Sequence, residues 1–244
     1  MRILLTAIHG IFTGQTDPSW PDKLDAWMYR LDSQVKVLKK EYRAGPFPRW
    51  NCWVKDPLLA RSLAKEIELF LTDSGQWPPA IWFVAHSNGA VIALLTAKLL
   101  IERGYRIGGL ILTGAACESD IDRNGVLEWQ CQGLLGAAIA YSSADDAVLA
   151  GNPPAPQFTK HDSLARFSTW LRGKALWPYG SLGRTGWLFK GAPPRTRSHS
   201  SSALTFQRPM TRWFSGGHSA YFRPEIILRT FEQVYEDVKS ETEA

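Results

Sequence analysis

The sequence predicts an α/β protein with a mostly parallel sheet of about six strands and helices on both faces. Short apolar runs alternate with amphipathic helical patterns along most of the 244 residues, as in successive βαβ units. Hydrophobic residues make up 45% of the chain, which is ample material for a core. No apolar run reaches the roughly 18 residues that a membrane helix needs. We therefore expect residues 1–244 to form one domain without a transmembrane segment.

The first elements follow from hydrophobic periodicity. "RILLTAI" (2–8) is a short apolar run and predicts a buried strand, and "WPDKLDAWMYRL" (20–31) has apolar residues at helical spacing. "QVKVLKKEY" (34–42) alternates as a strand does. The segment 56–75 is a strongly amphipathic helix, with Asp56 as its expected N-cap and a proline at the first helical position.

The same alternation continues toward the C-terminus. Apolar runs predict further strands, and the intervening periodic stretches predict helices. A glycine ends one helix, and Pro224 suits the first turn of the last one. In chain order the expected elements are a strand at 80–86, a helix at 88–103, strands at 107–116 and 134–143, a strand with its loop at 210–219, and a helix at 224–240.

Residues 151–208 interrupt this rhythm with a loop-rich insertion that could form a cap and holds one possible helix at 161–176. Within 151–212 there are ten Lys or Arg and a single acid, Asp162, so this stretch carries +9 and the remainder carries −4. A basic segment can attract an anionic substrate, lipid headgroups or nucleic acid, and a solvated basic loop explains it equally well. No nucleic-acid-binding motif is present, so we expect no nucleic-acid partner.

Ser87 lies between an apolar strand and a helical run in "IWFVAHSNGAVIAL" (81–94). The serine is either the N-cap of a buried helix or a nucleophile held on a sharp strand–turn–helix elbow. An elbow requires small residues two positions before and after the serine, and Ala85 and Gly89 meet this requirement as A-x-S-x-G. The choice depends on whether other strand ends supply a base, an acid and an oxyanion hole.

A base is available in "FSGGHSAYF", where His218 follows the last expected strand in a glycine-flanked loop. A serine hydroxyl is a poor nucleophile until a base takes its proton, and histidine has a suitable pKa for this task. The other histidines have more ordinary explanations. His9 and His86 lie in strand–loop motifs where orientation or packing is the expected role, so we take His218 as the general base.

An orienting acid is expected in "AIAYSSADDAVL", where Asp145 and Asp146 follow the fifth expected strand. An acidic pair after a strand is also an ordinary turn or cap, but here it completes the chain order Ser, Asp, His. We favour Asp145, because S-x-x-D-x-x-V returns Val148 to the core. Asp146 stays open as the alternative acid.

An oxyanion hole needs amides that face the developing charge. In "AIHGIFTG" the first strand ends at His9–Gly10, and the glycine allows the backbone to turn its amides inward. We expect the backbone N–H groups of Ile11 and Asn88 to form the hole. Considered alone, the His–Gly pair is only a turn that ends a strand.

These stretches resemble the α/β-hydrolase superfamily. The resemblance rests on "AIHGIFTG", "FVAHSNGA", "YSSADDAV" and "SGGHSAYF", and the A-x-S-x-G elbow is similar to that of a group of compact bacterial lipases. It implies a minimal α/β-hydrolase fold of about six strands, without the antiparallel strands that often precede the first strand found here. The insertion at 151–208, between the acid and the histidine, is longer than this resemblance implies.

The resulting hypothesis is a serine hydrolase, of carboxylesterase or lipase-like type, that cleaves an ester or thioester through an acyl-enzyme on Ser87. It needs no cofactor and no metal, and the histidines lack metal-ligand spacing. A nucleotide-binding protein is disfavoured because no G-x-G-x-x-G or P-loop motif is present. The alternative is a non-catalytic binding module that captures an anionic partner with the basic segment 151–212.

Three scattered cysteines and the absence of a recognisable signal peptide lead us to expect a cytoplasmic protein.

Overall fold

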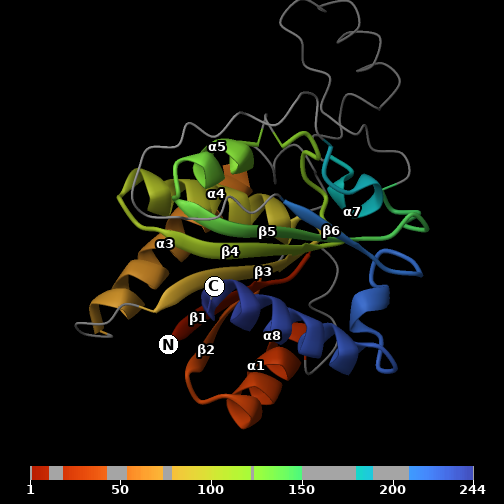
Figure 1. Ribbon diagram of the computed structural model, residues 1–244, viewed down its shortest axis with the longest axis horizontal. Coiled ribbons are helices and arrows are strands. Elements are labelled where there is room, and N and C mark those ends of the chain that lie inside the picture. The colour runs from red at the N-terminus through yellow and green to blue at the C-terminus, as the bar shows by residue number, and fades with distance from the viewer. Residues whose placement is uncertain are drawn as a thin grey trace, which may run out of the picture.

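The computed structural model describes residues 2–10, 19–42, 54–73, 79–121, 124–149, 180–188 and 209–243 (Figure 1). Its centre is a six-stranded sheet in the order β2-β1-β3-β4-β5-β6, and every described pair of neighbouring strands is parallel. Parallel neighbours require crossover connections, which the helices between the strands provide. The strands are β1 (Ile3–Ile8), β2 (Val35–Lys40), β3 (Ala80–His86), β4 (Ile107–Thr113), β5 (Leu135–Ser142) and β6 (Met210–Trp213).

Helices cover both faces of the sheet, as the sequence predicts (Figure 1). Each face has its own apolar core, because neighbouring residues of a strand point to opposite faces. In β1, Leu4 and Ile8 pack into one core, whereas Ile3 and Leu5 pack into the other. One face carries α3 (Asp56–Asp73), α4 (Gly89–Glu102) and α5 (Val126–Cys131), and the other carries α1 (Trp20–Leu31) and α8 (Ile227–Glu243).

The expected elements agree with the structure most closely where the apolar pattern is strongest. The bounds of α1 and β3 are those expected from the sequence. Strands β4 and β5 are shorter than expected, because the residues after them turn away from the sheet edge into loops. Strand β6 and the loop that follows it lie within the expected 210–219. Three short elements were not expected: α5, α7 (Leu182–Thr185) and the 3-10 turn Ala220–Phe222.

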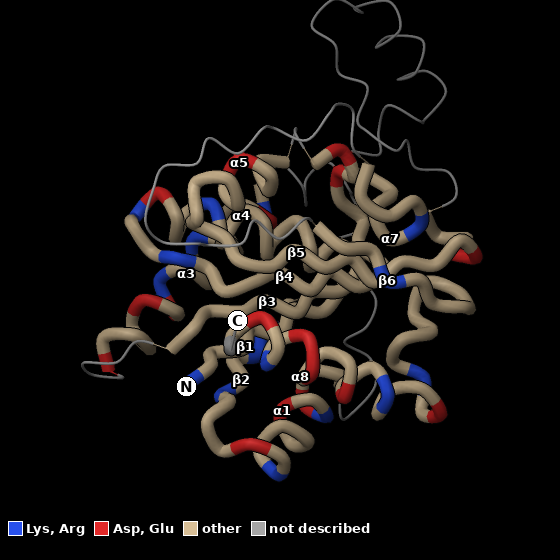
Figure 2. Tube along the Cα trace, viewed as in Figure 1, with Lys and Arg blue, Asp and Glu red and all other residues tan. Residues whose placement is uncertain are grey.

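Charged residues lie mainly in the helices and loops that surround the sheet, with both signs interspersed (Figure 2). The basic insertion 151–208, including the helix expected at 161–176, lies outside the described residues except for 180–188. Within the described parts of the chain, no helix is both long and apolar enough to cross a membrane.

Candidate active site

Ser87 lies on a sharp turn between β3 and α4, at the carboxyl edge of the sheet. Its φ is +55°, and it is the only non-glycine residue in the described ranges with a positive φ. Such a backbone conformation costs a non-glycine residue about 1 kcal/mol or more, so the surrounding structure must impose it. The turn directs the serine away from the strand, as a nucleophile elbow does.

Close packing around the turn explains the small residues on either side of the serine. A Cβ added to Gly89 would lie 2.7 Å from the main-chain oxygens of both Ile8 and His9. A Cβ added to Gly10 would lie 2.6 Å from the Cβ of Ser87. The ends of β1 and β3 therefore approach too closely for a side chain at either glycine.

His218 reaches Ser87 from the loop after β6. Its Nε2 lies 2.8 Å from Ser87 Oγ, and its side chain is only 11% exposed. His86, one residue before the serine, donates from Nε2 to the main-chain oxygen of His218 at 3.0 Å. Burial, with a contribution from His218, lowers the pKa of His86 to about 3, so this ring is a neutral donor. His86 thus anchors the histidine loop.

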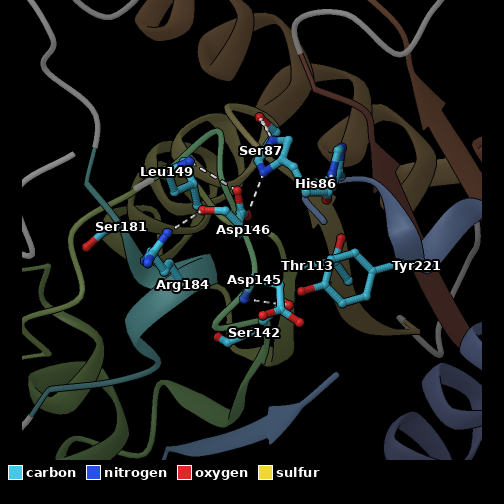
Figure 3. A network of polar contacts seen from close by, with 12 residues as sticks. His86, Ser87, Thr113, Ser142, Asp145, Asp146, Leu149, Ser181, Arg184 and Tyr221 are labelled. Carbon is cyan, nitrogen blue, oxygen red and sulfur yellow. Dashed lines mark hydrogen bonds and ion pairs between the residues drawn. The ribbon is translucent and has the colours of Figure 1, made fainter. Parts of the chain in front are cut away.

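Asp146 completes the arrangement on the far side of the histidine ring. Its Oδ2 lies 2.7 Å from His218 Nδ1, and the residue is fully buried. The Leu149 amide donates to Asp146 Oδ1 at 3.0 Å, and Arg184 Nη1 donates to the Asp146 main-chain oxygen at the same distance. Figure 3 shows Leu149 and Arg184 converging on Asp146. The carboxylate is therefore held by its own loop, and α7 holds the main chain of the same residue.

Asp145, which the sequence favours as the acid, does not contact His218. Its Oδ2 instead faces the Gly216 amide in the histidine loop at 3.4 Å. The reason is a one-residue error in the assumed return to the core: Val148 is 58% exposed, whereas Leu149 is buried. The D-x-x-apolar spacing holds, but it runs from Asp146 to Leu149. The open alternative, Asp146, is the residue that the structure places against the histidine.

Of the two residues expected to form the oxyanion hole, only one lies within the described residues. Ile11 lies outside them, whereas Asn88 directly precedes α4, where backbone amides favour negative charge. His9 is buried behind this edge, and its Nε2 accepts the Tyr42 amide at 3.0 Å while the two rings stack. His9 therefore links the segment that follows β1 to the segment that follows β2.

Solved structures share this architecture. No known family model and no curated protein sequence matches the chain. The structure of an arylesterase matches 98% of this chain and 76% of its own, at 10% identity and a TM-score of 0.52. An esterase of Pyrobaculum calidifontis matches 100% of this chain and 78% of its own, at 12% identity and a TM-score of 0.50. The chain has the α/β-hydrolase fold.

A third matched structure is that of a larger protein. It is an uncharacterized protein from Bacillus cereus ATCC 10987, with 13% identity and a TM-score of 0.52, and the match covers 99% of this chain but 60% of that one. At these identities the likeness concerns the fold alone, so the chemistry must be argued from the site.

Sequence reasoning missed three residues that surround the site of this α/β-hydrolase fold. Arg184 lies in the insertion, and nothing in its sequence context links it to the acid loop. Tyr42 and Asp56 contact the Asn88 side chain, although the sequence suggested only a cap for Asp56. Position offered a usable signal for these two, because Tyr42 follows β2 and Asp56 begins α3. Both positions belong to the carboxyl edge of a parallel sheet, where functional residues gather.

Proposed function

We propose that this protein is a serine hydrolase that cleaves carboxylic esters or thioesters through an acyl-enzyme on Ser87. The observation that carries the proposal is the continuous path from Ser87 Oγ to His218 Nε2 at 2.8 Å and from His218 Nδ1 to Asp146 Oδ2 at 2.7 Å. This path supports a nucleophile, a base and an orienting acid in the order that acyl transfer requires.

Acylation begins when His218 Nε2 takes the Ser87 proton while Oγ bonds to the substrate carbonyl carbon. The carbonyl π electrons move onto the oxygen, and the resulting oxyanion accepts hydrogen bonds from the Asn88 amide and, as the sequence predicts, the Ile11 amide. Asp146 stays ionised and stabilises the imidazolium through Nδ1–H. The oxyanion then re-forms the carbonyl, and the leaving alcohol or thiol departs with the proton from His218.

Deacylation repeats these steps with water as the nucleophile. His218 takes a proton from water, the hydroxide oxygen bonds to the acyl carbon, and the Ser87–carbon bond breaks as Oγ recovers the proton. The product is a carboxylic acid. Every step uses side chains and main-chain amides of this chain together with water.

Two features besides the geometry bear on the substrate. Two solved structures with this fold carry the name esterase, which agrees with ester cleavage. The basic stretch 151–212 favours a substrate with a negative charge, although most of this stretch lies outside the described residues. We propose a small acyl ester or thioester as the substrate class.

A panel of p-nitrophenyl esters and acyl thioesters of increasing chain length tests the proposal. We expect wild-type protein to hydrolyse at least one member and Ser87→Ala to reduce that rate at least a thousandfold. Asp145→Asn is the matched control, because the side chain is similar in size but does not touch His218. A folded wild-type protein that hydrolyses nothing would favour the binding module that captures an anionic partner.

A further inference from the structure

A second set of buried polar side chains lies next to the nucleophile turn. It comprises Tyr42, Asp56 and Asn88, which we call the buried polar cluster. Asp56 and Asn88 are fully buried, and Tyr42 is nearly so. Asn88 Nδ2 donates to Tyr42 Oη at 3.0 Å and to Asp56 Oδ1 at 3.2 Å. Three separate segments therefore meet at the side chain of the residue that follows Ser87.

The cluster is poorly explained as a device for stability. Asp56 Oδ2 and Asn88 Oδ1 are buried, and neither has a hydrogen-bond partner in the part of the chain that the structure describes. A buried carboxylate is normally compensated by a cation, but no ion pair joins Asp56 to one within the described ranges. An apolar residue in place of Asp56 would avoid this cost, so another property accounts better for the carboxylate.

The groups that face Asp56 do little to compensate its charge. Burial raises the pKa of Asp56 to about 7, while the hydrogen bond from Asn88 and the charge of Lys55 oppose this rise. Tyr42 is neutral, since burial raises the pKa of its phenol well above the ordinary value. His9 stacks on the Tyr42 ring and donates nothing to Asp56 in the described contacts. The cluster thus holds Asn88 through acceptors alone.

We propose that Asp56 is a positioning residue for the hydrolase: it fixes the Asn88 side chain and thereby the direction of the Asn88 backbone amide toward the oxyanion. The inference rests on the proposed function. Side chain and amide share one Cα, so a side chain held by two acceptors restricts rotation of the peptide that carries the amide. Ser87 already has a strained backbone, so the turn needs such a support to keep its geometry.

A carboxylate suits this role better than an amide. Both carboxylate oxygens accept hydrogen bonds, so the bond from Asn88 Nδ2 persists whichever oxygen faces it. A hydrogen bond to a charged acceptor is also stronger than one to a neutral acceptor. Tyr42 supplies the second acceptor, which fixes the plane of the Asn88 amide group.

Steady-state kinetics of Asp56→Ala, Asp56→Asn and Tyr42→Phe test the inference on the best ester of the panel. Loss of an oxyanion donor costs about 10²–10³ in kcat, and a misdirected donor costs less. We expect Asp56→Ala to lower kcat about 10- to 100-fold, with KM within about twofold. Asp56→Asn, which keeps one acceptor oxygen, should restore kcat to within about threefold of wild type. Tyr42→Phe should give an intermediate loss.

The matched control is Asp237→Asn. Asp237 is a buried carboxylate that pairs with Arg212 and lies outside the site. We expect its kcat per folded molecule to equal that of wild type. An active wild type with an unchanged kcat in folded Asp56→Ala and Tyr42→Phe would overturn the inference and leave the proposed function standing. If Asp56→Ala does not fold, Tyr42→Phe, which removes the second acceptor of Asn88, decides by the same criterion. Wild-type protein that neither hydrolyses esters nor reacts at Ser87 would overturn both.

Discussion

Replacing Asp56 by asparagine should make the protein more stable at alkaline pH. The folded chain holds the carboxyl group fully buried without an ion pair in the described residues, whereas the unfolded chain exposes it to water. Burial raises the pKa of Asp56 from its ordinary 3.8 to about 7. The folded state therefore binds this proton more tightly, which stabilises it at low pH. That stabilisation is lost as the pH rises from about 4 to about 7.

The expected magnitude follows from these two pKa values. A pKa difference of one is worth about 1.4 kcal/mol. At pH 8 both states are ionised, and the burial of the charged Asp56 lowers the free energy of unfolding by about 4 kcal/mol. At pH 5 the folded state keeps Asp56 protonated while the unfolded state ionises it, and the free energy of unfolding is lowered by about 2 kcal/mol. The side chain introduced by Asp56→Asn carries no charge and avoids this penalty. Its free energy of unfolding should therefore exceed that of wild type by about 4 kcal/mol at pH 8 and by about 2 kcal/mol at pH 5.

Urea unfolding of both proteins at pH 5 and pH 8, followed by circular dichroism, measures the effect. All other titrating groups are shared, so their contributions cancel in the difference between the two proteins. Asp237→Asn is the contrasting control. It removes a carboxylate that accepts from Arg212 and Tyr141, so it should destabilise by roughly 1–3 kcal/mol. If Asp56→Asn were less stable than wild type at pH 8, or if its advantage did not grow with pH, the reasoning would be refuted.

Three further predictions concern the turn, the histidine loop and the acid. Gly89→Ala should lose about 1–3 kcal/mol of stability in thermal unfolding, because its Cβ would meet two main-chain oxygens at 2.7 Å. The contrast is Gly217→Ala, whose Cβ would meet nothing within 4 Å, and equal losses would contradict the packing argument. Burial lowers the pKa of His86 from 6.5 to about 3. The contribution of neutral His86 to the stability of the fold is therefore fully present above pH 6.5 and is lost as the pH falls toward 3. His86→Phe should weaken that acid dependence by about 1.4 kcal/mol per pH unit in urea titrations, and an unaltered slope would contradict the prediction. Asp146→Asn should lower kcat about 10³- to 10⁴-fold in ester assays, whereas Asp145→Asn should change it less than about threefold. A larger loss from the Asp145 variant would reverse the assignment of the acid.

Local patterns were enough to predict the parts of the site that lie next to strong elements. Ser87 follows a continuous apolar strand and precedes a helix, and both boundaries are set by nearby residues. His218 could be selected because it alone combines a preceding strand with a glycine-flanked loop. The alternation of strands and helices likewise determined the sheet class, because parallel strands require crossover helices.

The acid could not be assigned from sequence, because the decision depends on a one-residue register. Val148 and Leu149 are both apolar, and only packing in the folded chain shows that Leu149 enters the core while Val148 faces solvent. That choice rotates the preceding turn and brings Asp146, instead of Asp145, to His218.

The buried polar cluster could not be predicted from local sequence patterns either, because it joins residues that are far apart in the chain. Asp56 and Asn88 are 32 residues apart in the chain, and the helix-cap pattern gave Asp56 a sufficient local explanation. A contact of this kind depends on how α3 docks beside the nucleophile turn. No periodicity or spacing in the sequence encodes that docking directly.

The measurement that tests the central claim most directly is the reaction of the folded protein with a fluorophosphonate probe, with the adduct located by mass spectrometry. We predict one adduct on Ser87 that is absent from Ser87→Ala, and much slower labelling of His218→Ala and Asp146→Asn. Asp145→Asn should label at nearly the wild-type rate. Folded wild-type protein that remains unlabelled, or that is labelled at a residue other than Ser87, would contradict the account.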